Sequence, residues 1–282
     1  MAQRKYPDKT SEQPPRQDGA KKSHPKSGGY RPPGRGRSDA DGLWLYGLHA
    51  VVAALRNPDR KKMQFLATSS ALENLSAHIK NPDPAPEIRD SEKIARLLPA
   101  GAVHQGLALR VQNLPEPDLK EVCAQGDDRT PRLVVVLDQL TDPQNVGAIL
   151  RSCVAFGATA VILTGHHAPP ASGVLAKAAS GALDIIPVVR VINLARAMEQ
   201  LAELGYWRVG LDSEAPQAIA DIDLSGNVAL ILGAEGSGLR QLTARKCDFL
   251  ARIPASGQLA SLNVSNAAAI ILYEVTRRRT PG

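Results

Sequence analysis

The chain has 282 residues, 43% of them hydrophobic and 22% charged, and its formal net charge at pH 7 is +6. This composition is ordinary for a globular protein and excludes wholesale disorder. No stretch approaches the roughly 18 apolar residues that a membrane span needs, and the polar first residues do not resemble a secretory signal. The sequence therefore predicts a soluble, cytoplasmic protein without membrane contacts.

Cysteine usage is sparse. The three cysteines are Cys123, Cys153 and Cys247, and no pair has the CxxC spacing. An odd number without that spacing argues against a disulfide framework and against a zinc site. We expect no metal ion.

Most of the net charge lies at the N-terminus. Residues 1–42 hold ten Lys and Arg against five Asp and Glu, and they include no Leu, Ile, Val or Phe. Such a segment cannot bury enough apolar surface to offset its ordering entropy, so we expect a disordered tail. A basic disordered arm binds RNA without specificity by releasing counterions. A solubilising tail with no partner is the alternative interpretation of the same composition.

The ordered chain is expected to begin near Leu43 with a small α/β domain over residues 43–112. The patterns predict helices over His49–Leu55 and, after a capping box of Ser70 and Glu73, as far as Ile79, and strands over Met63–Thr68 and Leu107–Val111. Residues 113–132 are polar and contain prolines, which is typical of a linker between domains.

Residues 133–282 predict a second, larger α/β domain. Apolar runs recur there between helical stretches, at Leu133–Leu137, Ala160–Leu163, Ile185–Val191, Arg208–Leu211 and Val228–Leu232. Continuous Val, Ile and Leu are typical of strands that helices cover on both faces. We therefore predict a parallel sheet with crossover helices.

The first polar motif spans residues 138–151 and reads DQLTDPQNVGAILR. Asp142 as N-cap and Pro143 at the first helical position predict the start of a helix. The face opposite the apolar stripe carries small residues around Arg151, whereas a solvated face would carry Lys and Glu. This pattern indicates that another group approaches the face closely. An exposed arginine on an alanine-rich helix is the alternative.

The second motif, residues 230–239, reads LILGAEGSGL, a strand that runs into a loop with three glycines. The glycines allow positive φ or the close approach of a ligand, but a simple tight turn is an equal alternative. Glu235 is either a solvated turn residue or an acid beside a ligand. The order GxxGxG is not a dinucleotide fingerprint.

The third motif, residues 253–269, reads IPASGQLASLNVSNAAA, which predicts a short strand, a polar turn and a helix that continues to Arg279. Ser261, Asn263, Ser265 and Asn266 exceed the number of polar residues that one helix cap requires. The terminal arginines 277–279 fit the C-terminal end of a helix by the macrodipole, an explanation we prefer to contact with RNA.

Taken in order, the three motifs resemble those of the SpoU family of RNA ribose 2'-O-methyltransferases, within the SPOUT superfamily. Residues 45–51 (LYGLHAV) and 104–106 (HQG) look like the L30e-like, substrate-binding domain of the large-subunit rRNA guanosine branch. Residues 1–42 lie outside the resemblance. One departure is Asn266, where many relatives carry an apolar residue.

The resemblance implies S-adenosylmethionine as cofactor and a C-terminal trefoil knot formed by the second and third motifs, in a domain covering residues 133–282. Gly233, Ile253 and Leu262 match the positions that contact the cofactor. The implied substrate is a guanosine in 23S rRNA, and a homodimer is expected because the family's catalytic sites lie beside a subunit interface.

The implied catalytic residues are Arg151, Asn145, Glu235, Ser261 and Asn263. The family places Arg151 near the ribose 2'-hydroxyl as a candidate base, although an arginine side chain is effectively always protonated. Arg151 can instead hold the adjoining phosphate and stabilise the developing alkoxide, which leaves the proton acceptor open. The other four residues are expected to fix Arg151, the cofactor and the nucleotide.

Three alternatives stay open at the level of sequence. The chain could methylate a tRNA guanosine, or it could be a catalytically silent RNA-binding protein that uses the small domain and the basic tail. A nicotinamide-dependent enzyme fits the α/β pattern less well, since the phosphate-loop fingerprint is missing. The intact polar residues of the motifs count against a silent protein.

Overall fold

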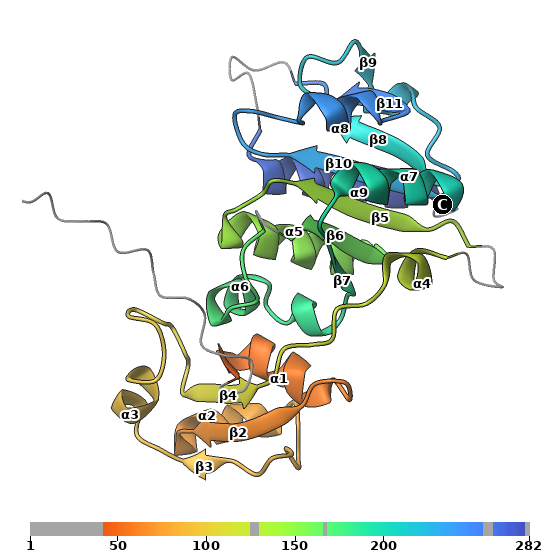
Figure 1. Cartoon of the computed structure of the whole chain (residues 1–282). Helices are drawn as coiled ribbons and strands as arrows, with labels where there is room; N and C mark the ends of the chain where they lie inside the picture. Colours follow the sequence, from red (N-terminus) through yellow and green to blue (C-terminus); the bar gives the residue numbers. More distant parts are fainter. Residues whose placement is uncertain (1–41, 125–129, 166–167, 256–261, 280–282) are drawn as a thin grey trace, which may run out of the picture. The chain divides into compact units, whose positions relative to one another are not determined.

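The structure is a computed structural model that describes residues 42–124, 130–165, 168–255 and 262–279. Two β-sheets with their covering helices account for these residues (Figure 1). The N-terminal segment that we expect to be disordered lies outside the described residues, apart from Gly42. The described helices include none long and apolar enough to span a membrane.

The first block is a four-stranded sheet with the strand order β1-β4-β2-β3, in which β1 and β2 pair antiparallel with β4 and β3 pairs parallel with β2. Its elements are β1 (Leu43–Tyr46), α1 (Leu48–Arg56), β2 (Lys62–Ala67), α2 (Ser69–Ser76), β3 (Glu87–Ile88), α3 (Ser91–Ala95) and β4 (Leu107–Val111). The predicted helices and strands of this block are confirmed to within three residues.

One helix start in the first block differs from the prediction. The hydroxyl of Thr68, not of Ser70, caps α2 by accepting a hydrogen bond from the Ala71 N–H. Thr68 directly follows β2, so the helix begins two residues earlier than the expected Ser70 cap would allow. The capping-box prediction was therefore wrong in its position.

The second block is a seven-stranded sheet with the order β7-β6-β5-β10-β8-β11-β9, and every described strand pair in it is parallel. Its strands are β5 (Leu133–Asp138), β6 (Ala160–Thr164), β7 (Val188–Val191), β8 (Trp207–Leu211), β9 (Gln217–Ala218), β10 (Val228–Gly233) and β11 (Phe249–Arg252). Its helices are α5 (Pro143–Ala155), α6 (Gly173–Ala178), α7 (Leu194–Glu203), α8 (Gln241–Arg245) and α9 (Val264–Arg279), with short 3₁₀ turns at Ala182–Asp184 and Ile219–Asp221. The predicted parallel sheet is confirmed.

Helices cover both faces of this sheet, which explains the continuous apolar runs. Alternate residues of β5 face opposite ways: Val135 and Leu137 pack with α5, α6 and α9, whereas Val134 and Val136 pack with α4 and α7. Both sets are fully buried, so no polar face is required along these strands.

Two predicted strands have different limits in the structure. The run Ile185–Val191 gives a strand only from Val188, because a 3₁₀ turn and Pro187 precede it. Near the C-terminus the strand is β11, which ends at Arg252, and not Ile253–Ala255. Pro254 has no N–H to donate to a neighbouring strand, so the ladder ends before it.

The stretch 113–132, interpreted as a linker, contains a helix. This helix, α4, spans Leu119–Cys123, and its residues Leu119 and Cys123 are buried against α7. The Asp118 side chain caps it by accepting from the N–H groups of Lys120 and Glu121. Part of the expected linker is therefore packed into the core of the second block.

The two blocks share a buried ion pair. Nε of Arg60, which follows α1, lies 2.7 Å from Oδ1 of Asp184, and both side chains are at most 4% exposed. Asn57 also donates to Asp184, and Arg60 donates to the carbonyl of Gln112. The Arg60 and Asp184 charges compensate each other, and the added hydrogen bonds offset part of the cost of burying them.

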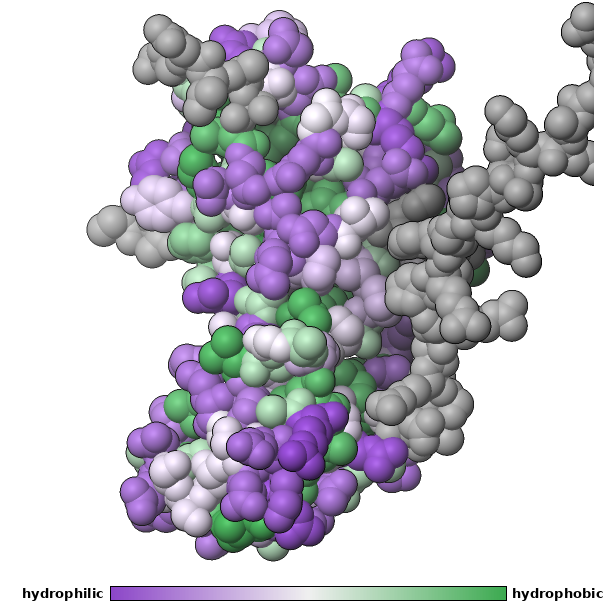
Figure 2. Space-filling model, turned by 90° about the vertical axis from the view of Figure 1, so that its left-hand side faces the viewer, coloured by the Kyte–Doolittle hydropathy of each residue, from purple (hydrophilic) through white to green (hydrophobic). Residues whose placement is uncertain are grey.

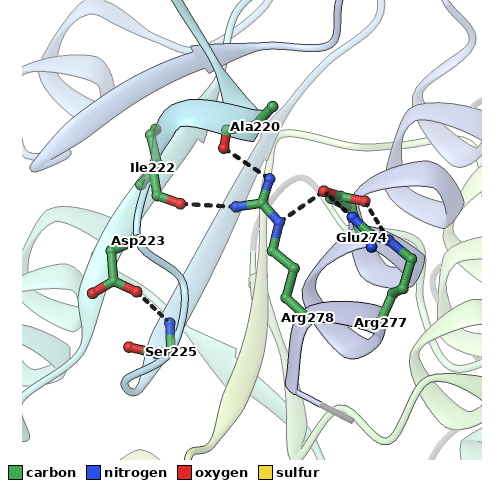
Figure 3. A network of polar contacts seen from close by, with 7 residues as sticks. All are labelled: Ala220, Ile222, Asp223, Ser225, Glu274, Arg277 and Arg278. Atoms are coloured by element: carbon green, nitrogen blue, oxygen red, sulfur yellow. Dashed lines mark hydrogen bonds and ion pairs between the residues drawn. The ribbon is translucent and has the colours of Figure 1, made fainter. Parts of the chain in front are cut away.

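Two arginines at the C-terminal end of α9 donate hydrogen bonds to backbone carbonyls of an earlier segment. Arg278 donates to the carbonyls of Ala220 and Ile222 and pairs with Glu274 at 2.7 Å (Figure 3). Arg279 donates to the carbonyls of Leu224 and Gly226. These contacts hold α9 against the segment between β9 and β10, which supports the structural explanation for these arginines rather than contact with RNA.

Candidate active site

The start of α5 positions the first motif. Asp142 caps the helix by accepting from the N–H groups of Gln144 and Asn145, and Pro143 occupies the first turn, as predicted. Asn145 is therefore held within the first turn of α5, directly beyond the carboxyl end of β5. Its side chain is half-buried and projects towards the loop that follows β10.

Gly147 explains part of the small-residue face on α5. A Cβ atom at this position would lie 2.5 Å from Cβ of Ala178 and 2.8 Å from its carbonyl carbon. The group that approaches this face closely is therefore α6, a neighbouring helix of the same chain. The inference of close approach is confirmed, but its cause at Gly147 is helix packing.

The loop after β10 folds back on itself. Ala234 and Gly238 form an isolated antiparallel bridge, and Gly236 and Gly238 have φ values of 80° and 63°. A Cβ at Gly233 would lie 2.2 Å from the carbonyl carbon of Gly238, so only glycine fits there. Beside Gly236 and Gly238 a Cβ would meet no atom of the described residues within 4 Å. The loop is tight on its inner side and open on its outer side.

A buried carboxylate ties this loop to the end of β5. Asp138 has no exposed side-chain surface, and its Oδ1 lies 2.7 Å from the Arg240 guanidinium. Its Oδ2 accepts from the Arg240 backbone N–H at 3.2 Å. Because β5 and β10 pair in register at Asp138 and Gly233, this pair fixes both ends of the loop at one edge of the sheet.

The three motifs meet at the carboxylate of Glu235. Its Oε1 accepts from the side-chain amide of Asn145 at 3.0 Å and from that of Asn263 at 2.6 Å. The two asparagines also touch each other, since Asn263 Nδ2 lies 3.1 Å from Asn145 Oδ1. Three of the predicted site residues therefore form one hydrogen-bonded cluster.

Asn263 has a second task at the start of α9. Its Oδ1 accepts from the backbone N–H groups of Ser265 and Asn266 and from the Ser265 hydroxyl. The same side chain thus caps α9 and fixes the Glu235 carboxylate. Helix capping therefore explains part of this run of polar residues. The contact of Asn263 with Glu235 is a second role that capping does not require.

Arg151 lies on the exposed surface of α5, six residues after Asn145. Among the described residues, none forms a hydrogen bond or an ion pair with its side chain. Helical side chains lean towards the N-terminus of their helix, which directs this long guanidinium back towards the Asn145 end. The described residues therefore leave the guanidinium without a partner and exposed.

The predicted cofactor residues lie at the same edge of the sheet. Gly233 ends β10, and Ile253 follows β11. Because β8 lies between these two strands, the two positions are separated by two strand spacings, about 10 Å across the sheet. Ile253 is half-buried and Leu262 is 45% exposed. Ser261 lies outside the described residues. The described part of the chain holds no cluster of three or more His, Cys, Asp or Glu that could bind a metal ion.

The buried thiols of Cys153 and Cys123 are unsuited to act as nucleophiles. Burial raises the pKa of Cys153 to about 12 and that of Cys123 to about 11. Both thiols are therefore protonated at neutral pH and behave as small apolar core residues.

Sequence reasoning missed the role of two residues. Asp138 was noted only as part of the first motif, and Arg240 lies one residue after the second motif. A signal existed in the strand pattern, since Asp138 is the one charged residue at the end of an otherwise apolar run. Its partner could not be inferred, because Arg240 is 102 positions away in sequence.

Comparisons with known proteins identify the family of the chain. Residues 132–273 match the SpoU rRNA Methylase family. The chain is 39% identical over 247 residues to the 23S rRNA (guanosine-2'-O-)-methyltransferase RlmB of Pseudomonas aeruginosa, an alignment that covers 84% of this chain and 97% of that protein. It is 41% identical over 243 residues to the protein of the same name from Pseudomonas putida, with 83% and 96% covered.

The structure is similar to that of the SpoU methyltransferase AviRb from Streptomyces viridochromogenes in complex with AdoMet. The TM-score is 0.72 at 26% sequence identity, and the match covers 86% of this chain and 92% of that one. A family match over residues 132–273, relatives that align along nearly their full length and a common fold all agree. The chain belongs to the SpoU rRNA methylase family.

Proposed function

We propose that the chain transfers a methyl group from S-adenosylmethionine to the ribose 2'-hydroxyl of a guanosine in 23S rRNA. The observation that carries the proposal is the cluster of Asn145, Glu235 and Asn263, which brings the three motifs together at the start of the helix that also carries the exposed Arg151. The relatives named for this reaction align over 83–84% of the chain, which supports the same substrate class. A cytoplasmic location follows from that substrate.

The residues at the sheet edge fit the cofactor. S-adenosylmethionine combines an uncharged adenosine with a sulfonium and supplies an electrophilic methyl group when bound. Ile253 and Leu262 offer apolar surface, and the backbone at Gly236 and Gly238 borders open space. A lysine-bearing phosphate loop is not required for a ligand without phosphates. Gly233 shapes the loop that provides this surface.

Arg151 is proposed to orient the nucleotide. Its exposed guanidinium can hold the phosphate next to the target ribose by two parallel hydrogen bonds and stabilise the oxyanion that develops at O2'. Asn145, Glu235 and Asn263 fix the geometry of the loop and of the helix starts around that ribose, with Ser261 assigned to the same role. Positioning of this kind supplies most of the rate enhancement that the site needs.

A trefoil knot in the C-terminal part is proposed from the path of the chain. After β10 the chain passes to β11, on the far side of β8, and then returns to α9, which packs with α5. Asn263, on the returning segment, contacts the Glu235 loop that precedes β11. The hydrogen bonds of Arg278 and Arg279 at the end of α9 support a fixed position for the returned segment.

A homodimer is proposed from the exposed surface of α9. Ile270 is 43% exposed and Tyr273 is 55% exposed, on a helix whose other face is buried against α5. Apolar side chains on one helix face favour packing against a second copy. Sedimentation at assay concentration should give a dimer; a fully active monomer would contradict this part of the proposal.

The first block, residues 43–112, is proposed to be an L30e-like domain that binds the RNA substrate.

The basic N-terminal segment is proposed to be a disordered arm that adds non-specific affinity for RNA. Removal of residues 1–42 should leave a folded, methylating enzyme whose RNA binding is weaker and less sensitive to salt. Loss of folding on truncation would show that the segment is structural.

Mapping of ribose methylation tests the substrate. Deletion of the gene should remove one 2'-O-methylguanosine from 23S rRNA and leave the tRNA pattern unchanged, and the wild-type gene should restore it. A lost tRNA methylation instead would identify the tRNA alternative. Unchanged patterns in both RNAs would favour a silent RNA-binding protein.

A further inference from the structure

A groove of about 480 Å³ lies on the first block, away from the cluster of motif residues. It opens on the sheet face that carries Tyr46, Leu66 and Ala108, which α3 covers only in part. Side chains from β1, β2 and β4 form its floor, and residues in and around α3 form one wall. The lining residues are Gly42, Trp44, Gln64, Leu66, Arg89, Lys93, Leu97 and Arg110.

The chemistry of the groove combines positive charge with flat apolar surface. Arg89, Lys93 and Arg110 contribute three cations, and the lining residues include no carboxylate. Trp44 and the 46% exposed Leu97 supply the apolar surface. Hydrophilic side chains gather over this block on the face shown in Figure 2. This combination suits a ligand with negative charge and an aromatic ring.

Arg89 and Lys93 are available to such a ligand. Arg89 pairs with Glu87 at 2.8 Å and Lys93 pairs with Asp90 at 3.1 Å, but all four side chains are at least 42% exposed. Exposed ion pairs of this kind contribute little free energy and exchange easily. A phosphate can therefore replace either carboxylate as the partner.

We propose that this groove binds an unpaired nucleotide of the RNA substrate. The base lies against the indole of Trp44 and the side chain of Leu97, and the flanking phosphates contact Arg89 and Lys93. Proteins commonly recognise single-stranded RNA by stacking splayed bases on aromatic side chains within a basic groove. The proposal rests on an RNA substrate and assigns a defined surface of the first block to it.

Charge excludes the nearest competing occupant. Gly42 lines the groove, so residues 1–41 are the nearest segment in sequence, but residues 1–42 carry five more positive than negative charges. A basic segment is repelled by a groove lined with three cations, whereas RNA is attracted to both. A base-paired duplex is also disfavoured, since its bases are stacked inside and cannot reach Trp44.

Fluorescence of Trp44 tests the proposal directly. The chain has two tryptophans, and a Trp207→Phe variant keeps an aromatic ring beside Phe249 while leaving Trp44 as the single indole. Addition of a single-stranded RNA hexamer should quench the emission of this variant, and a duplex of the same sequence should quench it much less. Equal quenching by both would contradict recognition of an unpaired base.

Charge reversal provides the matched test. Arg89→Glu with Lys93→Glu should weaken hexamer binding by on the order of tenfold or more and lower the salt slope by about two. Arg96→Glu is the control, because Arg96 is also an exposed cation paired within α3 but does not line the groove. The double change alters the charge by four units and Arg96→Glu by two, so a control loss of half the double variant's free-energy change or more would indicate non-specific attraction and overturn the assignment.

Methyl transfer separates this proposal from the proposed function. The double variant should raise KM for 23S rRNA and leave kcat and S-adenosylmethionine affinity unchanged, because no residue of the cluster is altered. If wild type binds and quenches but transfers no methyl group, the proposed function fails and the groove stands. If wild type methylates 23S rRNA while Trp44 emission is insensitive to bound RNA, the groove proposal fails alone.

Discussion

The side-chain amide of Asn145 donates a hydrogen bond of 3.0 Å to Oε1 of Glu235, a residue 90 positions further along the chain. Asn145 belongs to the first turn of α5 and Glu235 to the loop after β10, and β5 and β10 are neighbours in the parallel sheet. Because both segments leave the carboxyl ends of adjacent strands, the sheet itself brings them together. Asn263 completes the contact from the start of α9.

Replacement of Glu235 should separate charge from hydrogen bonding. Glu235→Gln retains an oxygen that accepts from both asparagines, so methyl transfer should fall by less than about tenfold. Glu235→Ala leaves both amides without this partner, and kcat/KM should fall by about a hundredfold. Single-turnover rates on 23S rRNA measure both. Unchanged rates for Glu235→Ala would remove the cluster from the mechanism.

Arg151 is exposed and has no partner among the described residues, so its replacement is a clean test of function. Arg151→Ala should change the free energy of unfolding by no more than about 0.5 kcal/mol. Turnover should nevertheless fall by about a hundredfold or more, with cofactor affinity little altered.

Arg151→Lys refines that test. Lysine keeps the charge but loses the planar fork, so a bidentate phosphate contact predicts a severe loss and a point-charge role predicts partial activity. Wild-type rates for both Arg151 variants would show that the exposed face of α5 is merely solvated.

At position 147, alanine should destabilise the protein relative to glycine, which is the opposite of the usual effect in a helix. Alanine normally stabilises a helix interior relative to glycine by about 1 kcal/mol. Here the new methyl group would collide with Ala178 on α6, so Gly147→Ala should lower the free energy of unfolding by about 1–3 kcal/mol. Denaturant titration measures the sign, and a stabilised variant would show that α5 and α6 are not so closely packed.

The fold and the site differ in how far sequence predicts them. The parallel strands were predicted from runs of Val, Ile and Leu, because strands that helices cover on both faces have continuous apolar sequences. The cap of α5 followed from Asp142 and Pro143, which act locally. By contrast, the contact of Asp138 with Arg240 depends on strand order, which no local pattern encodes.

Two details of the structure were missed for a related reason. The polar stretch 113–132 was interpreted as a linker, since two buried residues on one short helix, Leu119 and Cys123, give too weak a period to detect. The small face of α5 was correctly associated with close approach. The approaching group at Gly147 is nevertheless α6, because composition reports only that space is limited and not what limits it.

Alkaline pH should destabilise the protein through its buried thiols. Burial raises the pKa of Cys153 from 9.0 to about 12. In the unfolded chain this thiol ionises first, so its stabilising contribution is complete below about pH 9 and is lost as the pH rises towards 12. The free energy of unfolding should fall by up to about 1.4 kcal/mol per pH unit for this thiol. Cys153→Ala should flatten the decline; an unchanged slope would contradict this cause.

Transfer of a labelled methyl group from S-adenosylmethionine to unmodified 23S rRNA tests the central claim most directly. The RNA is digested to nucleosides after the reaction, and the labelled product is identified by chromatography, with unmodified tRNA as the parallel substrate. The account predicts label in 2'-O-methylguanosine from 23S rRNA, none from tRNA, and a loss of about a hundredfold for Arg151→Ala. Label on a base, label only in tRNA, or no transfer by the folded protein would contradict it.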